Sequence, residues 1–76
     1  MQREIWQIAK DIREDWRKPY FGAVPYLHAL GALTTVQSKY GMDDAKTIIL
    51  YFLSNAGSWR GEKAKAIKAE LKQLIK

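Results

Sequence analysis

The sequence contains no cysteine and a single histidine, and these absences exclude several kinds of site. Without cysteine there is no disulfide and no thiolate metal ligand, which favours a reducing compartment. A zinc site needs three or four suitably spaced ligands, and the sequence shows no such spacing. Since His28 is the one histidine, only one base is available to Ser38, Ser54 or Ser58, and no serine forms a pattern with it. We therefore expect no cofactor, no metal and no enzymatic activity.

The sequence also lacks a long apolar run and an apolar leader. The uncharged stretch from Pro19 to Thr35 contains two prolines and two glycines, and its apolar part is shorter than the roughly 20 residues that a bilayer span needs. The first fifteen residues mix both charge signs. With 47% hydrophobic and 28% charged residues, the chain is too apolar to be disordered. We expect one domain over residues 1–76 and no membrane segment.

Hydrophobic periodicity predicts a compact all-α bundle of four helices, over about residues 3–17, 23–39, 44–56 and 59–75. In the first helix the apolar residues recur at helical spacing on one stripe (Ile5, Ile8, Ala9, Ile12, Trp16). The second helix accommodates Pro25 in its first turn, and Gly41 is the expected stop.

The third helix is expected at the centre of the bundle. Asp43 or Asp44 can cap its start, and residues 48–53 form an unbroken apolar run that predicts burial on all sides. Because an unbroken run has no period, a central β-strand is the alternative. Ser58 is the expected cap of the fourth helix.

Most of the net charge of +5 lies on the last segment, where residues 59–76 carry six basic and two acidic groups. Lys65, Lys68, Lys72 and Lys76 fall within an arc of about 80° beside the core stripe. This face is either solvated or, together with Arg60, a footprint for nucleic acid or an acidic partner. It has no aromatic residue that would read bases, so only nonspecific phosphate contact is expected.

A second candidate surface lies on the first helix, where Trp6 is flanked by Lys10, Arg13 and Arg17. A tryptophan beside the core stripe with cations around it is typical of a protein-interaction patch. The alternative is that Trp6 packs beneath the second or fourth helix with the cations stacked on its ring. A third candidate is the small-residue face of Gly31, Ala32 and Thr35, which would let another helix approach, from this chain or from a second copy.

The stretch WRKPYFGAVPY contains both prolines of the chain and four aromatic residues. We expect a structural loop in which Pro19 ends the first helix and three rings (Tyr20, Phe21, Tyr26) cover one end of the core. The residues assigned to this loop are Trp16, Pro19, Tyr20, Phe21, Gly22, Pro25 and Tyr26. The alternative is a binding loop.

Three stretches together resemble a group of small proteins encoded in tailed-phage and prophage genomes: DWRKPYFGAVPYLHAL, the YG before an acidic helix start, and YFLSNAGSWRGEKAKAIKAELKQL. The resemblance covers about residues 5–75, and its most specific parts are residues 20–23 with Pro25-Tyr26, and Asn55 with residues 59–61. The group has no assigned function and transfers no catalytic residue. The resemblance implies a phage accessory protein made in the bacterial cytoplasm, of a kind that commonly binds host or phage machinery.

The leading hypothesis is therefore a non-catalytic phage or prophage protein that contacts a host or phage protein, modulating a host process or a defence system. One alternative is a nucleic-acid-associated protein that uses the basic face of the C-terminal helix. The other is a structural subunit that forms a homodimer through its second helix.

Overall fold

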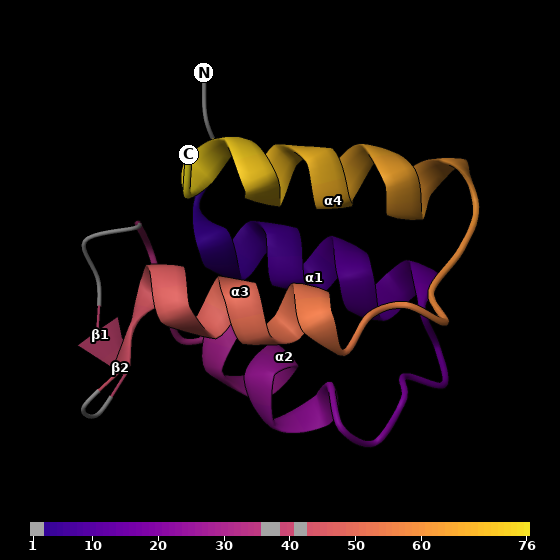
Figure 1. Ribbon diagram of the computed structural model, residues 1–76, viewed down its shortest axis with the longest axis horizontal. Coiled ribbons are helices and arrows are strands. Elements are labelled where there is room, and N and C mark those ends of the chain that lie inside the picture. The colour runs from indigo at the N-terminus through magenta and orange to yellow at the C-terminus, as the bar shows by residue number, and fades with distance from the viewer. Residues whose placement is uncertain (1–2, 36–38, 41–42) are drawn as a thin grey trace.

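The computed structural model describes residues 3–35, 39–40 and 43–76, and within them the chain forms four helices. These are α1 (Ile5–Asp15), α2 (Val24–Leu30), α3 (Ala45–Ser54) and α4 (Glu62–Leu74) (Figure 1). Two short strands, β1 (Lys39–Tyr40) and β2 (Asp43–Asp44), pair in antiparallel fashion immediately before α3. The predicted all-α bundle is confirmed.

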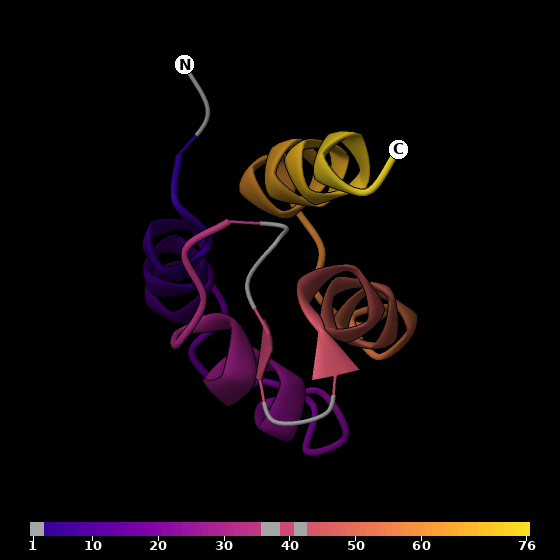
Figure 2. The same ribbon diagram turned by 90° about the vertical axis from the view of Figure 1, so that its left-hand side faces the viewer.

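The helices surround one core, as the end-on view shows (Figure 2). α1 packs against α2 and α4, and α3 packs against the same two helices from the other side. Each helix contributes fully buried residues, among them Ile8, Leu30, Ile49 and Leu71. No helix of this described bundle lies at its axis.

The third helix is therefore not central and not buried on all sides, contrary to the prediction. Leu50 is 52% exposed and Tyr51 is 49% exposed. An apolar run of six residues points around the whole circumference of a helix, but a bundle of this size covers only part of that circumference. The β-strand alternative for this segment is wrong.

The start of α1 is completed by the chain that follows α2. The N–H groups of Ile5 and Trp6 donate to the carbonyls of Thr34 and Leu33, at 2.8 and 2.9 Å. The Glu4 N–H donates to the side-chain oxygen of Gln7 at 3.0 Å. The first N–H groups of a helix have no partner inside it, so the helix begins where residues 33 and 34 can supply these partners.

Helix α2 is much shorter than the predicted helix over residues 23–39, because it ends at Leu30 with Gly31 as its cap. The next two amides turn back onto the carbonyls of Ala29 and Leu30. This turn buries Leu33 completely and presents the carbonyls that α1 uses. Residues 36–38 of the predicted helix and its expected stop, Gly41, lie outside the described residues.

The start of α3 is as predicted, whereas the start of α4 is not. The Asp44 carboxylate accepts a hydrogen bond from the Thr47 N–H at 2.8 Å. Helix α4 begins at Glu62, with Gly61 at its cap, so Ser58 does not cap it. The reason is Trp59, which is only 2% exposed and must leave the helical path to reach the core.

An aromatic cluster forms around Trp59. Its ring stacks on that of Trp16, with the ring centres 5.7 Å apart. The Phe52 ring meets the Trp16 and Trp59 rings edge-on, at centre-to-centre distances of 6.3 and 6.4 Å. The Trp59 indole N–H donates to the Asp15 carboxylate at 2.8 Å, so the one polar atom of this ring is satisfied. The cluster joins the end of α1 to α3 and to the chain entering α4.

The loop between α1 and α2 has the predicted structural role only in part. Trp16 is buried, Tyr26 packs on the core and lies 5.5 Å from the Tyr51 ring, and Pro25 lies in the first turn of α2. A Cβ at Gly22 would come within 2.6 Å of the Tyr20 ring and 2.8 Å of the Asn55 side-chain oxygen, so a larger residue there would have to displace these side chains.

Phe21 and Tyr20 do not cover the core, contrary to the prediction. Phe21 is 79% exposed, and Tyr20 is about half exposed, with its ring 4.7 Å from that of Phe21. The loop tightens through a hydrogen bond of 2.8 Å from the Ala23 N–H to the Tyr20 carbonyl. This turn places Ala23 in the core and leaves Phe21 outside it.

Candidate functional site

The charged side chains of α1 are separated onto two flanks. The acidic flank faces α4, because the Arg3 guanidinium binds Asp11 of α1 and also Glu70 of α4, at 2.7 Å. Asp15 holds the Trp59 indole. Asp11 and Asp15 of the acidic flank therefore bind partners within the fold. The basic flank lies on the side of α1 that meets α2.

A cavity of about 430 Å³ lies between α1 and α2. It is lined by Trp6, Ala9, Lys10, Arg13, His28, Gly31 and Ala32. Three residues of the predicted interaction patch thus meet two residues of the predicted small-residue face. Arg17 and Thr35 do not line the cavity.

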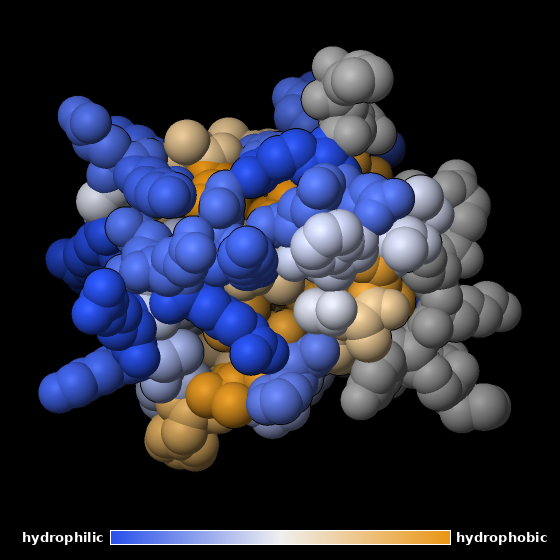
Figure 3. All heavy atoms as spheres, turned by 180° about the vertical axis from the view of Figure 1, so that it is seen from behind, coloured by the Kyte–Doolittle hydropathy of each residue, from blue (hydrophilic) through white to orange (hydrophobic). Residues whose placement is uncertain are grey.

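A second cavity, of about 210 Å³, shares Arg13 and His28 with the first. Its remaining lining residues are Pro19, Val24 and Leu27. The two cavities are therefore adjacent, and together they are here called the α1–α2 groove. Around it, the face crossed by α1 is mostly hydrophilic, with small apolar areas between the polar side chains (Figure 3).

Trp6 lies at the rim of this groove and is 41% exposed. The alternative that it packs beneath another helix under stacked cations is wrong. Its indole N–H donates to the Glu4 carboxylate, and the cation–π contact seen in the described part of the chain joins other residues, Lys68 and Trp59.

His28 is exposed and lines the groove, although the sequence did not indicate this position for it. Ala9 was predicted only as part of the core stripe, not as a lining residue of the groove. The signal was present: the basic flank of the first helix and the small face of the second are adjacent if the two helices pack antiparallel. Only the packing shows that they are.

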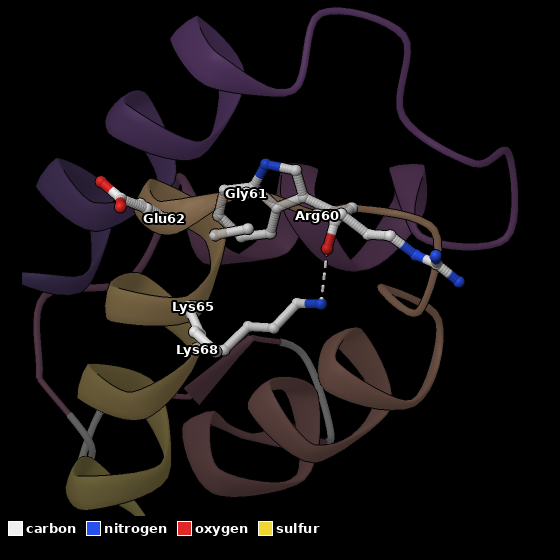
Figure 4. A pocket seen from close by; sticks show the side chains of 7 residues that line it. Arg60, Gly61, Glu62, Lys65 and Lys68 are labelled. Carbon is white, nitrogen blue, oxygen red and sulfur yellow. Dashed lines mark hydrogen bonds between the residues drawn. The ribbon is translucent and has the colours of Figure 1, made fainter.

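The predicted basic face of α4 is split by the structure. Arg60, Lys65 and Lys68 line a cavity of about 410 Å³ with Trp59, Gly61, Glu62 and Ala64. Lys72 and Lys76 lie further along the chain, outside it. In the close view, Lys68 extends toward the Trp59 carbonyl, whereas Arg60 and Glu62 point away to opposite sides (Figure 4).

Lys68 differs from the other lysines of this face. Its ammonium group donates to the Trp59 carbonyl at 2.7 Å and lies 5.8 Å from the centre of the Trp59 ring. Partial burial lowers its pKa, and the neighbouring charges of Lys72 and Arg60 lower it further. Lys68 is thus partly structural, while Arg60, Lys65, Lys72 and Lys76 are exposed.

The described residues show neither a group of metal ligands nor a membrane-spanning helix. Among the residues that the structure describes, no three histidine, aspartate or glutamate side chains are grouped to hold a metal ion. No helix within the described ranges is both long enough and apolar enough to cross a membrane.

Comparison with protein-family models, with curated proteins and with solved structures finds no match to this chain.

Proposed function

We propose that this protein is a small non-catalytic binding protein that contacts a protein partner through the α1–α2 groove. The observation that carries the proposal is the convergence of an exposed tryptophan, two cations and a floor of small residues in this groove. Tryptophan and arginine are the residues that most often dominate protein interfaces. Small floor residues let an incoming side chain or helix approach closely.

The resemblance to small proteins of tailed phages and prophages supports a setting for this activity. In that setting the partner is a host or phage protein in the bacterial cytoplasm, and binding modulates a host process or a defence system. This part of the proposal rests on the resemblance.

A tagged pull-down with mass spectrometry, with and without nuclease, tests the proposal. Ala32→Phe fills the floor of the groove without changing charge. Ala66→Phe makes the same change on the exposed side of α4 and is the matched control. We expect the wild type and the control to recover the same partner and Ala32→Phe to lose it. Recovery of nothing specific, or an equal yield with Ala32→Phe, would overturn the proposal.

A second candidate function, nonspecific nucleic-acid binding, is favoured by the uncompensated charge of α4. The ion pairs found in the described part of the chain are those of Arg3, so Arg60, Lys65, Lys72 and Lys76 have no acidic partner there. Phosphate contacts would make the affinity for duplex DNA fall with salt, by a slope of about −0.9 per contact. In a mobility-shift titration, Lys65→Glu with Lys72→Glu should abolish binding. Unchanged binding by that variant would exclude this function.

Self-association through the second helix is the third candidate. Gly31 and Ala32 lie in the groove, so a second copy would compete with any other occupant. The native mass at micromolar concentration distinguishes self-association from binding of another partner, because in a monomer no second copy occupies the groove.

A further inference from the structure

We infer that the occupant of the α1–α2 groove is an acidic, elongated segment of a protein partner, with apolar side chains on the groove floor and carboxylates against Lys10 and Arg13. This inference rests on the proposed function and names the chemistry of its partner.

Charge is the first argument. Lys10 and Arg13 enter the groove from α1, and His28 enters it from α2. No aspartate or glutamate among the described residues lines either part of the groove. Asp11 and Asp15 of α1 bind Arg3 and Trp59 outside the groove, and the Glu4 carboxylate accepts the hydrogen bond of Trp6 at its rim. Lys10 and Arg13 form no ion pair with the described residues, so the groove lining carries net positive charge and is complementary to an acidic segment.

The floor is the second argument. Ala9 is buried, and Gly31 and Ala32 offer no side chain beyond a methyl group. One guanidinium nitrogen of Arg13 lies 3.9 Å from the position that a Cβ of Gly31 would take. Arg13 thus lies beside the glycine, in the same cavity that Trp6 lines. A carboxylate that enters this cavity can bind the guanidinium through two parallel hydrogen bonds.

The shape is the third argument. The second cavity adjoins the first at Arg13 and His28 and is otherwise lined by Pro19, Val24 and Leu27. An occupant that fills both cavities must be elongated and must carry two apolar contacts. This favours a polypeptide segment over a nucleic acid, whose phosphates would gain nothing from the apolar parts of the groove.

The experiment is a fluorescence-anisotropy titration of the full chain with a labelled peptide in which glutamates flank two leucines. Three probes serve for comparison: the same peptide with lysine for glutamate, the same peptide with serine for leucine, and a single-stranded DNA oligonucleotide of equal charge. The test variant is Lys10→Glu with Arg13→Glu. The control is Lys65→Glu with Lys72→Glu, which makes the same change of charge on α4, outside the groove.

We expect the glutamate–leucine peptide to bind the wild type and the control within about twofold, and the groove variant about tenfold more weakly, which corresponds to about 1.4 kcal/mol. The lysine and serine peptides should bind more weakly than the parent. Raising the salt should weaken binding, because the pairs are exposed. Circular dichroism of both variants checks their folding, and Arg13→Gln provides a milder groove variant with the same expected direction.

The inference is overturned by no binding of the glutamate–leucine peptide, by equal loss in the control, or by equal binding of the lysine peptide or of the DNA in the groove. These failures differ from failure of the proposed function. If a captured partner is lost by Ala32→Phe but binds normally to Lys10→Glu with Arg13→Glu, the groove is the site and its partner is not acidic. If Ala32→Phe changes nothing, the site itself is wrong.

Discussion

At the scale of single residues, the aromatic side chains of this protein fall into two groups that composition cannot separate. Trp16, Phe52 and Trp59 pack together in the core, whereas Trp6 and Phe21 are exposed. Exposed rings on so small a domain are candidates for contact with a partner.

The two phenylalanines provide a matched test of this division. Phe52→Ala should lower the free energy of unfolding by about 3–5 kcal/mol, because it leaves a cavity in the core. Phe21→Ala should change it by less than about 0.5 kcal/mol, since the ring is mostly in solvent. Urea denaturation measures both. A large loss for Phe21→Ala would show that this ring is covered in solution, contrary to the structure.

Arg3 connects two helices through the carboxylates of Asp11 and Glu70. The hydrogen bond from Arg3, reinforced by its charge, holds the pKa of Asp11 below its ordinary value. A carboxyl whose pKa is lower in the folded than in the unfolded state stabilises the fold when ionised, above about pH 4. That contribution is lost as the pH falls through the folded-state pKa.

Asp11→Asn should therefore reduce stability at pH 7 by less than about 1 kcal/mol, because both partners are about one-third exposed. The variant should also lose less stability than the wild type when the pH is lowered from neutral to about 3. Urea denaturation at the two pH values measures this difference. Glu14→Gln, at an exposed position of the same helix, is the control. If the stability of that variant depended on pH as weakly as that of Asp11→Asn, the role of Arg3 would be contradicted.

At the scale of elements, helix boundaries are set by contacts from elsewhere in the chain. Gly31 ends α2 early because residues 33 and 34 are needed at the start of α1. Trp59 delays α4 because its ring is needed in the core. Gly61 then begins α4 with a φ of 115°, a region that other residues rarely adopt.

The two glycines that precede α4 should respond in opposite directions to alanine. Gly61→Ala should cost about 1–3 kcal/mol, because its backbone conformation is strained for any L side chain. At Gly57 an added Cβ meets nothing within 4 Å, so Gly57→Ala should be neutral or stabilise by up to about 1 kcal/mol. Thermal unfolding followed by circular dichroism compares them, and equal midpoints for both variants would refute the conformation assigned to Gly61.

At the scale of the whole molecule, the core and the charges are arranged so that the fold behaves as one unit. The aromatic cluster joins α1, α3 and the entry to α4, and α2 is held by the same buried core. Charge is distributed differently: Asp11 and Asp15 of α1 bind Arg3 and Trp59, whereas basic groups lie at the α1–α2 groove and along α4.

Unfolding should accordingly be a single cooperative transition. In a Trp6→Phe variant, fluorescence reports only the buried Trp16 and Trp59, while far-ultraviolet circular dichroism reports all helices. The two signals should give the same midpoint in urea. The same variant should lose most of the acrylamide quenching of the native protein, since Trp6 is the exposed indole. If the circular dichroism signal fell at a lower urea concentration than the fluorescence signal changed, α2 would unfold separately.

Local sequence patterns were sufficient for the number of helices, the core stripe of α1 and the cap at Asp44. These features depend on spacing along one helix or on a side chain three residues from its partner, so they are readable without the rest of the chain. The same patterns also placed Trp6, Lys10 and Arg13 together on one flank.

The tertiary structure determines the remaining features, because each depends on contacts between residues that are far apart in the sequence. The end of α2 depends on the unpartnered amides of α1, and the start of α4 depends on where Trp59 finds space. Whether Phe21 is buried depends on the turn that places Ala23 in the core. The groove depends most of all on tertiary structure, since the basic flank of one helix and the small residues of another come together only when the two helices pack side by side.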